Sequence, residues 1–586
     1  MAVRLEWEGK PQQVERLILP FQTVETINES RATRERDAGS LLRSQARAEA
    51  GRNQLIWGDN KLVMSSLLRD FAGRVKLIYI DPPFDTGADF AYRVSVGDES
   101  VEKLPSILEE YAYRDTWGHG RGSYLSMLYE RLVLMHELLA DDGSLFVHLD
   151  WHQGHYVKVM LDEIFGEGRF LNEIVWWYYN KLQGNINRFA SNHDVLLWYA
   201  KTENYTFHRL REPREKTKRQ QKRAWDPETK SLKQARDAEG KLVYYDETER
   251  TIDDVWRLPY LMPANTTENV RYQTQKPVAL AERVIAASTD PGDLVADFFC
   301  GSGTALVGAE RIGRRWIGCD LGRFAIHTTR KRLLNVPDCR PFDVKNLGAY
   351  ERQRWQMATG DGALRAYLDT ILAFYRADPL EGFAHLHGRK ANRMVHVGAT
   401  DAPVTIDETE DVMDEMADNG IEACDLLGWE WEMGLHDTIS ERARRRGLDV
   451  RPRQIPREVM ERQVTEADAV RFFELAHVDL DVRRQGQEAC VVLKDFAIPS
   501  EDLIPPKVRE RIGAWSDLID YWAVDFDFSD EVFHNQWQAY RTRENPVLAT
   551  QSDWHEYPGA GRYVIVVKII DIFGNDTTKL AEVRIK

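Results

Sequence analysis

The stretch ADFFCGSGTALVGAERIGRRWIGCD, residues 296–320, decides the fold. The apolar run LVADFF over 294–299 predicts a buried strand, and the glycines of the CGSGT loop that follows it predict a tight turn. A helix is expected to about residue 312, and RWIGCD over 315–320 predicts the next strand. A strand, a helical crossover and a second strand are typical of a parallel sheet with right-handed connections.

The same alternation is found on the N-terminal side of this stretch. The runs VKLIYI over 75–80 and LFVHLD over 145–150 are continuously apolar enough to predict buried parallel strands. Between them, apolar residues at spacings of three and four predict a helix over 122–140. We therefore expect an α/β fold in which helices cover a parallel sheet.

The rest of the chain departs from this pattern in four places. Residues 1–52 are polar and charge-rich, which predicts a partly helical extension, and residues 205–260 are basic with interspersed Tyr and Trp, which predicts an inserted module. Residues 339–479 return to alternating strands and helices, with a capping-box signal at Thr405 and Glu408, and predict a second, smaller α/β domain. From residue 480 the apolar period is two, which predicts a C-terminal antiparallel β domain.

Composition and charge bound the class of protein. The chain has 586 residues, of which 43% are hydrophobic and 29% are charged, and these values exclude a fibrous or largely disordered protein. The net charge is −16, but residues 401–440 alone carry 13 acidic side chains and no Lys or Arg. Residues 209–241 carry 12 basic against 6 acidic side chains. That local excess is either a solvated face or a positive surface for nucleic acid.

The cysteines and the hydropathy of the chain indicate in which cellular compartment the protein is expected. The five cysteines are far apart and form no C-x-x-C pair or short Cys/His cluster, so we expect no disulfide framework and no metal site. No apolar run is long enough to span a membrane, and the first residues hold no apolar signal segment. These features together predict a cytoplasmic protein without a membrane contact.

The glycine loop is the clearest sign of a cofactor. It lies between a strand and a helix, so the free N–H groups of the helix face a ligand there, and Asp320 at the end of the next strand is placed to accept hydrogen bonds from ribose hydroxyls. Leu306 replaces the last glycine of the dinucleotide fingerprint, and no P-loop Lys-Ser/Thr follows. A nucleoside cofactor without a pyrophosphate fits, such as S-adenosylmethionine; a plain strand-to-helix turn is the alternative.

The tetrapeptide DPPF, residues 81–84, follows the strand over 75–80. Ligands of parallel sheets bind at the carboxyl ends of the strands, where this tetrapeptide lies. Two prolines fix the backbone, so Asp81 and the Pro82 carbonyl can together accept two hydrogens from an exocyclic amine, and Phe84 offers a face for stacking. A simple strand-ending turn is the other interpretation of these residues.

The motifs taken together resemble a known family. YIDPPF (79–84), LFVHLD (145–150), TQKP (274–277), DFFCGSGT (297–304) and WIGCD (316–320) are similar in kind and order to the motifs of β-class amino-group DNA methyltransferases. Asp-Pro-Pro-Phe resembles the N6-adenine branch, and TQKP resembles the modification subunit of type III restriction-modification systems. The resemblance covers about residues 53–335. It implies a Rossmann-like methyltransferase sheet and direct methyl transfer from S-adenosylmethionine, with no metal.

The resemblance also implies site residues. Asp81, Pro82, Pro83 and Phe84 would hold and stack the target adenine. The cofactor side would be formed by residues of the glycine loop and its surroundings: Asp297, Phe299, Gly301, Ser302, Gly303 and Thr304 for the methionine half, Asp320 for the ribose, Lys276 near the carboxylate and Asp59 near the adenine ring. For Lys276, a solvated helix N-terminus is the alternative.

The implied organisation divides the chain into six parts. They are an extension (1–52), a catalytic half of the methyltransferase domain (53–204), a target-recognition insert (205–260), a cofactor-binding half (261–338), a second α/β domain (339–479) and a C-terminal β domain (480–586). The expected partners are double-stranded DNA, a restriction helicase-nuclease subunit and a second copy of the chain. Two other functions stay open: methylation of the cytosine N4 amine, and a non-catalytic DNA-specificity subunit.

The C-terminal region lies outside the resemblance. Aromatic residues beside many acids, namely Trp515, Trp522, Phe526 and Phe528, suggest an exposed surface for a protein partner, with a buried β core as the alternative. The sequence leaves the recognition site, the number of methylated strands and the oligomeric state open.

Overall fold

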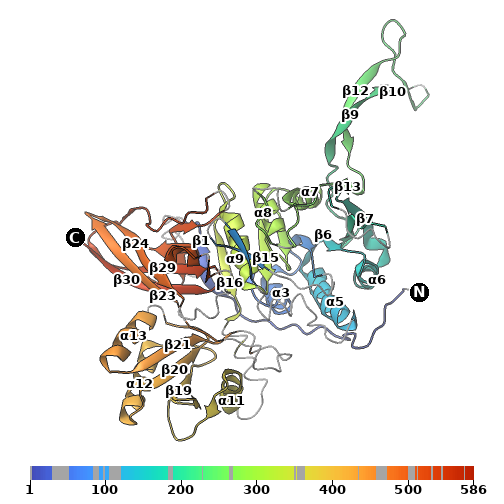
Figure 1. Cartoon of the computed structure of the whole chain (residues 1–586). Helices are drawn as coiled ribbons and strands as arrows, with labels where there is room; N and C mark the ends of the chain where they lie inside the picture. The colour runs from blue at the N-terminus through green and yellow to red at the C-terminus, as the bar shows by residue number, and fades with distance from the viewer. Residues whose placement is uncertain are drawn as a thin grey trace.

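Figure 1 shows the computed structural model of the chain. It describes residues 3–29, 52–83, 92–96, 99–103, 121–181, 189–227, 229–262, 268–272, 274–348, 352, 363–432, 435–456, 459, 472–474, 476–498, 509–510, 512–529, 532–542, 545–572 and 574–586.

An eleven-stranded sheet forms the centre of the molecule (Figure 1). Its order is β13 (Val255–Arg257), β7 (Phe170–Trp177), β8 (His193–Ala200), β6 (Leu139–Leu149), β3 (Val75–Ile80), β14 (Leu294–Asp297), β15 (Arg315–Asp320), β2 (Asn53–Trp57), β16 (Phe342–Asn346), β1 (Gln22–Ile27) and β26 (Phe533–Asn535).

The strands from β6 to β16 in this order are parallel to their neighbours, so their carboxyl ends meet at one edge of the sheet. Strand β8 runs antiparallel to both β6 and β7, so β7 also ends at that edge. We call this edge the carboxyl edge.

Helices cover both faces of the sheet. Helices α3 (Asn60–Phe71), α5 (Arg121–Leu138) and α6 (Gly154–Phe165) pack on one face, and α7 (Val278–Ser288), α8 (Thr304–Arg311) and α9 (Arg323–Leu334) on the other. Each face has its own apolar core, and the strands that face both cores are the apolar runs of the sequence. The predicted α/β sheet is therefore confirmed.

The basic insert forms an arm that projects from the sheet (Figure 1). Strands β9 (Arg211–Gln221) and β12 (Tyr244–Thr251) pair antiparallel, and β10 (Arg223–Asp226) pairs with β11 (Ser231–Gln234) near the tip. We call residues 211–251 the arm. The chain then returns to the main sheet, because β13 pairs with β7, so the end of the predicted insert is a strand of the central sheet.

The second α/β region has a six-stranded sheet in the order β17 (Asp378–Pro379), β18 (Gly388–Lys390), β19 (Arg393–Val397), β20 (Ala423–Gly428), β21 (Asp449–Gln454) and β22 (Phe473–Glu474). Helix α11 (Ala363–Tyr375) packs on one core, while α12 (Ile406–Asp418) and α13 (Leu435–Arg445) contribute to another. The predicted capping box is present at the start of α12: the Thr405 side chain accepts from the Glu408 N–H, and the Glu408 carboxylate accepts from the Thr405 N–H.

The C-terminal region consists of two small antiparallel sheets that share one apolar core. They are β23 (His477–Gln485), β24 (Glu488–Ala497) and β28 (His555–Glu556), and β27 (Trp537–Tyr540), β25 (Ile519–Asp525), β29 (Gly561–Asp571) and β30 (Asp576–Ile585). Trp522 and Phe526 are fully buried in this core, and Trp515 and Phe528 pack against buried residues. The hypothesis of an exposed aromatic surface there is wrong: Trp515, Trp522 and Phe526 pack in the core that the two sheets share, and Phe528 packs in a second buried cluster.

The N-terminal segment is tied into the fold by a strand. The sequence suggested a partly helical extension, but residues 22–27 form β1, which pairs with β16 and with β26 of the C-terminal region; residues 30–51 lie outside the described part. Glu25 of β1 is fully buried, and its Oε2 lies 3.0 Å from Arg330 Nη2 of α9 and 3.0 Å from Lys568 Nζ of β29. Burial raises the pKa of Glu25, but these two cations outweigh that effect and lower it. The buried ion pairs therefore join three distant parts of the chain.

No helix in the described ranges is both long enough and apolar enough to cross a membrane.

Candidate active site

Three carboxylates lie side by side along the carboxyl edge. Asp81 follows β3, Asp297 ends β14 and Asp320 ends β15, and these three strands are neighbours in the sheet. Burial, and then the negative charges of Asp81 and Asp320, raise the pKa of Asp297 well above its usual range. The sequence predicted each of the three as a site residue, and the strand order brings them together.

Asp81 is held by a buried lysine. The Lys276 Nζ lies 2.5 Å from Asp81 Oδ2, and the two side chains are 9% and 15% exposed. Burial lowers the pKa of Lys276, but the charges of Asp81 and Asp194 outweigh burial and raise it above its ordinary value. The ammonium is therefore retained at neutral pH, and it fixes one oxygen of Asp81.

The other oxygen of Asp81 is available. Asp81 Oδ1 is buried and has no hydrogen-bond partner within the described part of the chain. A buried acceptor without a donor is costly unless a ligand supplies one. Pro82 beside it is buried and Pro83 is half-buried, while Phe84 lies outside the described residues.

The glycine loop is shaped by close packing against α9. Gly301 and Gly303 have φ of +50° and +74°, and a Cβ on Gly303 would lie 2.6 Å from the Thr329 methyl group. The Thr329 hydroxyl donates to the Gly301 carbonyl at 2.9 Å. Both the backbone conformation and the available space therefore require glycine at 303.

Asp320 is fixed by two backbone donors. Its carboxylate accepts from the Gly301 N–H at 2.8 Å and from the Gly322 N–H at 2.9 Å. An ionised carboxylate offers about four acceptor positions, so this anchoring is compatible with further hydrogen bonds from ribose hydroxyls.

A buried arginine of α9 supports the remaining loop residues. Arg332 Nη1 donates to the Ser302 carbonyl at 2.8 Å and to the hydroxyls of Ser302 and Thr304 at 3.0 Å. The Thr304 hydroxyl also donates to the Lys276 carbonyl at 3.2 Å, which links the loop to the TQKP segment. Arg332 was not among the residues selected from the sequence, because a lone Arg in a helix carries no local signal of a long-range contact.

Two further predicted residues have structural partners. Asp59 is the N-cap of α3: its Oδ1 accepts from the Lys61 N–H at 2.7 Å and lies 3.1 Å from Arg131 Nη2. Phe299 is half-buried against the core, and the Phe299 N–H donates to Asp297 Oδ1 at 3.0 Å. The roles of both residues toward a cofactor stay predictions.

None of the five cysteines forms a disulfide. Cys300, in the glycine loop, is buried, and burial together with the charges of Asp320 and Asp297 raises the pKa of its thiol well above its usual range. A neutral thiol is a poor nucleophile. Within the described residues no group of three or more His, Cys, Asp or Glu side chains is arranged to hold a metal ion.

The donor set fits S-adenosylmethionine. The edge carries three carboxylates beside the ammonium of Lys276, so a cofactor with cationic groups is favoured there. Asp320 has acceptor positions beyond its two backbone donors, so its carboxylate would fit ribose hydroxyls. The residues that would hold the cofactor are Asp297, Gly301, Gly303 and Asp320.

The sheet, the glycine loop and the carboxylates at its edge define the class of the protein: the chain belongs to the DNA methylase family, whose family model matches residues 75–331. The fold, the family and the methyl donor expected from the sequence are thereby confirmed.

Among curated relatives, Type II methyltransferase M.EcaI of Enterobacter cloacae is 30% identical over 48% of this chain and 69% of that protein. The StyLTI Mod subunit, a type III restriction-modification enzyme of Salmonella typhimurium, is 32% identical over 26% of this chain and 24% of that protein. The chain therefore spans about a quarter of that subunit's length. Among solved structures, the M1.HpyAVI–SAM complex aligns with 48% of this chain and 99% of its own, with 20% identity and a TM-score of 0.30.

Proposed function

We propose that the chain is a site-specific DNA methyltransferase that transfers a methyl group from S-adenosylmethionine to N6 of an adenine flipped out of duplex DNA. The observation that carries the proposal is the geometry of Asp81: Lys276 holds Oδ2, and Oδ1 is buried without a partner among the described residues. An aromatic exocyclic amine is the donor that this oxygen lacks. The family model supports amino-group methylation of DNA, and the DPPF sequence favours adenine.

The residues of the site perform two tasks in this reaction. Asp81 Oδ1 and the Pro82 carbonyl would accept the two hydrogens of the target amine, orient its lone pair and take up charge as the new N–C bond forms. The bound cofactor supplies an electrophilic methyl group on its sulfonium. The glycine loop and Asp320 would hold that cofactor in line with the amine, so alignment accounts for much of the rate. Lys276 is assigned here to Asp81 rather than to the cofactor carboxylate.

The arm supports binding of duplex DNA. It exposes Lys216, Lys218, Lys222 and Arg223, whose charges can contact phosphates. It also exposes aromatic and apolar side chains, namely Trp225, Leu232, Tyr244 and Tyr245, which can approach bases. We therefore propose the arm as the target-recognition element.

Further aromatic rings are exposed near the target site. Trp151 lies just beyond the carboxyl end of β6, and Trp177 and Tyr179 lie at the carboxyl end of β7, so all three are at the edge that holds Asp81. Tyr179 is 53% exposed, which is unusual for a ring beside a sheet. Such faces suit stacking with bases displaced when the adenine leaves the duplex.

The first test is direct labelling. Purified chain is incubated with mixed-sequence duplex DNA and labelled S-adenosylmethionine, and the DNA is digested to nucleosides. We expect label on N6-methyladenine, and we expect none with Asp81→Ala. Label on N4-methylcytosine would overturn the base assignment and keep the family. Cofactor binding without label on any base would instead favour a non-catalytic specificity subunit.

The arm is tested by its salt dependence. The double variant Lys218→Ala/Arg223→Ala should bind duplex DNA more weakly, with the slope of log K against log salt reduced by about 0.9 for each phosphate that the variant no longer neutralises. The matched control is Arg562→Ala, which removes an exposed basic side chain from the C-terminal region. An unchanged slope for the arm variant would exclude phosphate binding by these two side chains.

We also propose that the methylation serves a restriction-modification system, because several relatives are type III Mod subunits by name. A helicase-nuclease subunit is then the partner to seek, by co-purification with the intact chain. A homodimer, expected from the family resemblance, has no support from the comparisons and is not proposed.

A further inference from the structure

Helix α9 lies between the glycine loop and the C-terminal region. Thr329 and Arg332 of this helix hold the loop. His327 and Lys331 of the same helix instead contact Asp520 of β25, in the C-terminal region. Successive residues of a helix are rotated by about 100°, so His327 and Lys331 share one face of α9. Thr329 and Arg332 lie on the roughly opposite face.

Asp520 is the centre of a mostly buried ion cluster. Its Oδ2 lies 2.7 Å from His327 Nε2, and both of its carboxylate oxygens lie 2.8 Å from Lys331 Nζ. The side chains of Asp520, His327 and Lys331 are 17%, 4% and 19% exposed, so salt screens these contacts little. Burial raises the pKa of Asp520, but the charge of Lys331 and the hydrogen bond from His327 outweigh burial and lower it. The carboxylate is therefore charged at neutral pH and binds both side chains of α9.

Further contacts join the same helix to the C-terminal region. Arg330 of α9 pairs with Glu25 of β1, and Glu25 also binds β29. Phe324 and Leu334, near the two ends of α9, pack against apolar cores of the C-terminal region. The helix is thus held along its length by a region that lies outside the matched family model, which covers residues 75–331.

On its other face, α9 packs closely against the glycine loop. A Cβ on Gly303 would lie 2.6 Å from the Thr329 methyl group, and the Thr329 hydroxyl donates to the Gly301 carbonyl at 2.9 Å. Arg332 is buried, and its Nη1 donates to three oxygen atoms of the loop. Close-packed elements transmit strain to each other, so a shift of α9 would displace the loop backbone.

We propose that Asp520 is a positioning residue for the cofactor: it fixes α9 from the C-terminal region, so that Thr329 and Arg332 keep the glycine loop in the conformation that receives S-adenosylmethionine. The inference rests on the proposed function, in which this loop holds the cofactor. Asp520 acts through α9 and not by contact with the loop. The C-terminal region thereby has a task in methyl transfer, because the cofactor site is complete only while that region is docked on α9.

The test is Asp520→Asn in the full chain, which keeps the shape of the side chain and removes the charge that binds His327 and Lys331. We expect the dissociation constant for S-adenosylmethionine, measured by equilibrium dialysis without DNA, to rise about 3- to 30-fold, the range for residues that couple distant sites. In methyl-transfer assays on mixed-sequence duplex, KM for S-adenosylmethionine should rise by a similar factor. The kcat should change little, because the variant leaves Asp81 and its surroundings intact.

A matched control separates positioning from a general loss of stability. Ser552→Ala removes a buried hydroxyl that accepts from the Val491 N–H within the C-terminal region. It should lower the stability of that region without removing a contact to α9. All dissociation constants are measured at a temperature below the onset of unfolding of each variant, and we expect Ser552→Ala to bind S-adenosylmethionine as the wild type does.

Three outcomes overturn the inference: a wild-type dissociation constant for Asp520→Asn, a loss that falls on kcat and not on KM, and an equal rise of the dissociation constant in the Ser552→Ala control. If Asp520→Asn does not fold, Lys331→Gln removes one of the two α9 partners of Asp520, and a wild-type dissociation constant for it would also count against the inference. Wild-type protein is measured in parallel. If it binds no S-adenosylmethionine, the proposed function fails; if it binds and Asp520→Asn binds equally well, the inference alone fails.

Discussion

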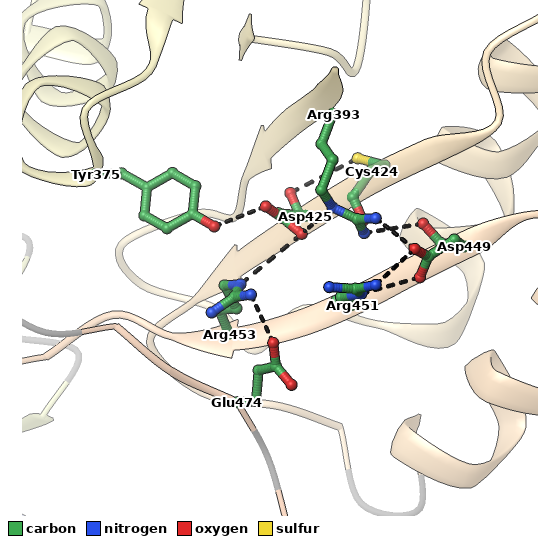
Figure 2. Close-up of polar contacts among 8 residues, drawn as sticks. All are labelled: Tyr375, Arg393, Cys424, Asp425, Asp449, Arg451, Arg453 and Glu474. Atoms are coloured by element: carbon green, nitrogen blue, oxygen red, sulfur yellow. Dashed lines mark hydrogen bonds and ion pairs between the residues drawn. The ribbon is translucent and has the colours of Figure 1, made fainter. Parts of the chain in front are cut away.

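Two buried aspartates at opposite ends of parallel strands show how the same side chain serves different purposes. Asp425, near the start of β20, accepts from Arg393 Nε on Oδ1 and from the Tyr375 hydroxyl on Oδ2, both at 2.7 Å (Figure 2). Asp81, just after β3, is bound by Lys276 on Oδ2, and its Oδ1 has no partner among the residues that the structure describes.

The two aspartates differ in whether both carboxylate oxygens have a hydrogen-bond donor. Figure 2 shows a closed network around Asp425, in which Arg393 also pairs with Asp449, and Arg451 pairs with Asp449 in turn. Each charged side chain drawn there pairs with an opposite charge, so the network stabilises the second α/β domain. Asp81 has one buried acceptor without a donor in the described part of the chain, and under the proposed function the substrate amine supplies that donor.

The largest expected effect is on catalysis. Asp81→Asn should lower the methyl-transfer rate by about 10²–10³-fold, because an amide cannot take up charge from the amine as a carboxylate does. The midpoint of thermal unfolding should also fall, because the buried Lys276 ammonium loses its nearest carboxylate, so the rates are compared per folded molecule. Labelled S-adenosylmethionine assays and thermal melts on the same preparation measure both, with Asp142→Asn, which removes an exposed carboxylate that pairs with Lys76, as control. A variant that keeps the wild-type rate would remove the basis for calling Asp81 catalytic.

Asp425→Asn should lower the stability of the second α/β domain and leave the methyl-transfer rate unchanged. It leaves Arg393 without its buried partner carboxylate, and breaking such a pair costs about 3 kcal/mol. Hydrogen exchange of the β20 and β21 amides should become faster, while the methyl-transfer rate per folded molecule should stay the same. Equal loss of activity and of protection would mean that the two regions are coupled and that the comparison fails.

Lowering the pH should change the stability of the two regions in different ways. The folded-state pKa of Asp297 is raised by burial, so the native state binds a proton more readily than the unfolded state, and the catalytic domain gains stability as pH falls from 7 toward 5. Hydrogen bonds from Arg451 and Arg393 outweigh burial and lower the pKa of Asp449, so its contribution is fully present above about pH 4 and is lost only below that. Hydrogen exchange at pH 7, 6 and 5, corrected for intrinsic rates, should show added protection in β14 and none in β21.

The smallest expected effect is at the capping box of α12. Thr405→Ala should cost about 1 kcal/mol of the second domain's stability, because the Glu408 N–H loses its side-chain acceptor. The control is Thr370→Ala in α11, whose hydroxyl donates to the Ala366 carbonyl four residues earlier in the same helix. That change should be near neutral. If both variants melt alike, the cap does not contribute as expected.

Local patterns in the sequence predicted the local parts of this structure. The strands that lead to Asp81, Asp297 and Asp320 are short apolar runs bounded by turn residues, and the α12 cap is a pattern of four residues. The proximity of the three carboxylates follows from these predicted strands, because the carboxyl ends of parallel strands meet at one edge of the sheet.

Contacts between distant residues could not be predicted in the same way. His148 and Asp194 are 46 residues apart, and no local sequence pattern indicates that they pair. The pairing of Lys276 with Asp81, 195 residues away, depends on the order of the strands, which periodicity does not specify. The same holds for Trp522, which is buried because a second sheet covers it.

The pairing of β1 with β26 has a consequence for the timing of synthesis. β1 ends at Ile27 and β26 begins at Phe533, so a ribosome adds about 500 residues between them. At about 5–20 residues per second, the nascent sheet lacks its outermost strand for roughly 25–100 s. Throughout that interval β1 offers an unpaired backbone edge, which other growing chains can pair with. Synthesis of the C-terminal region therefore determines when β1 can no longer pair with other chains that are being made on the same messenger RNA.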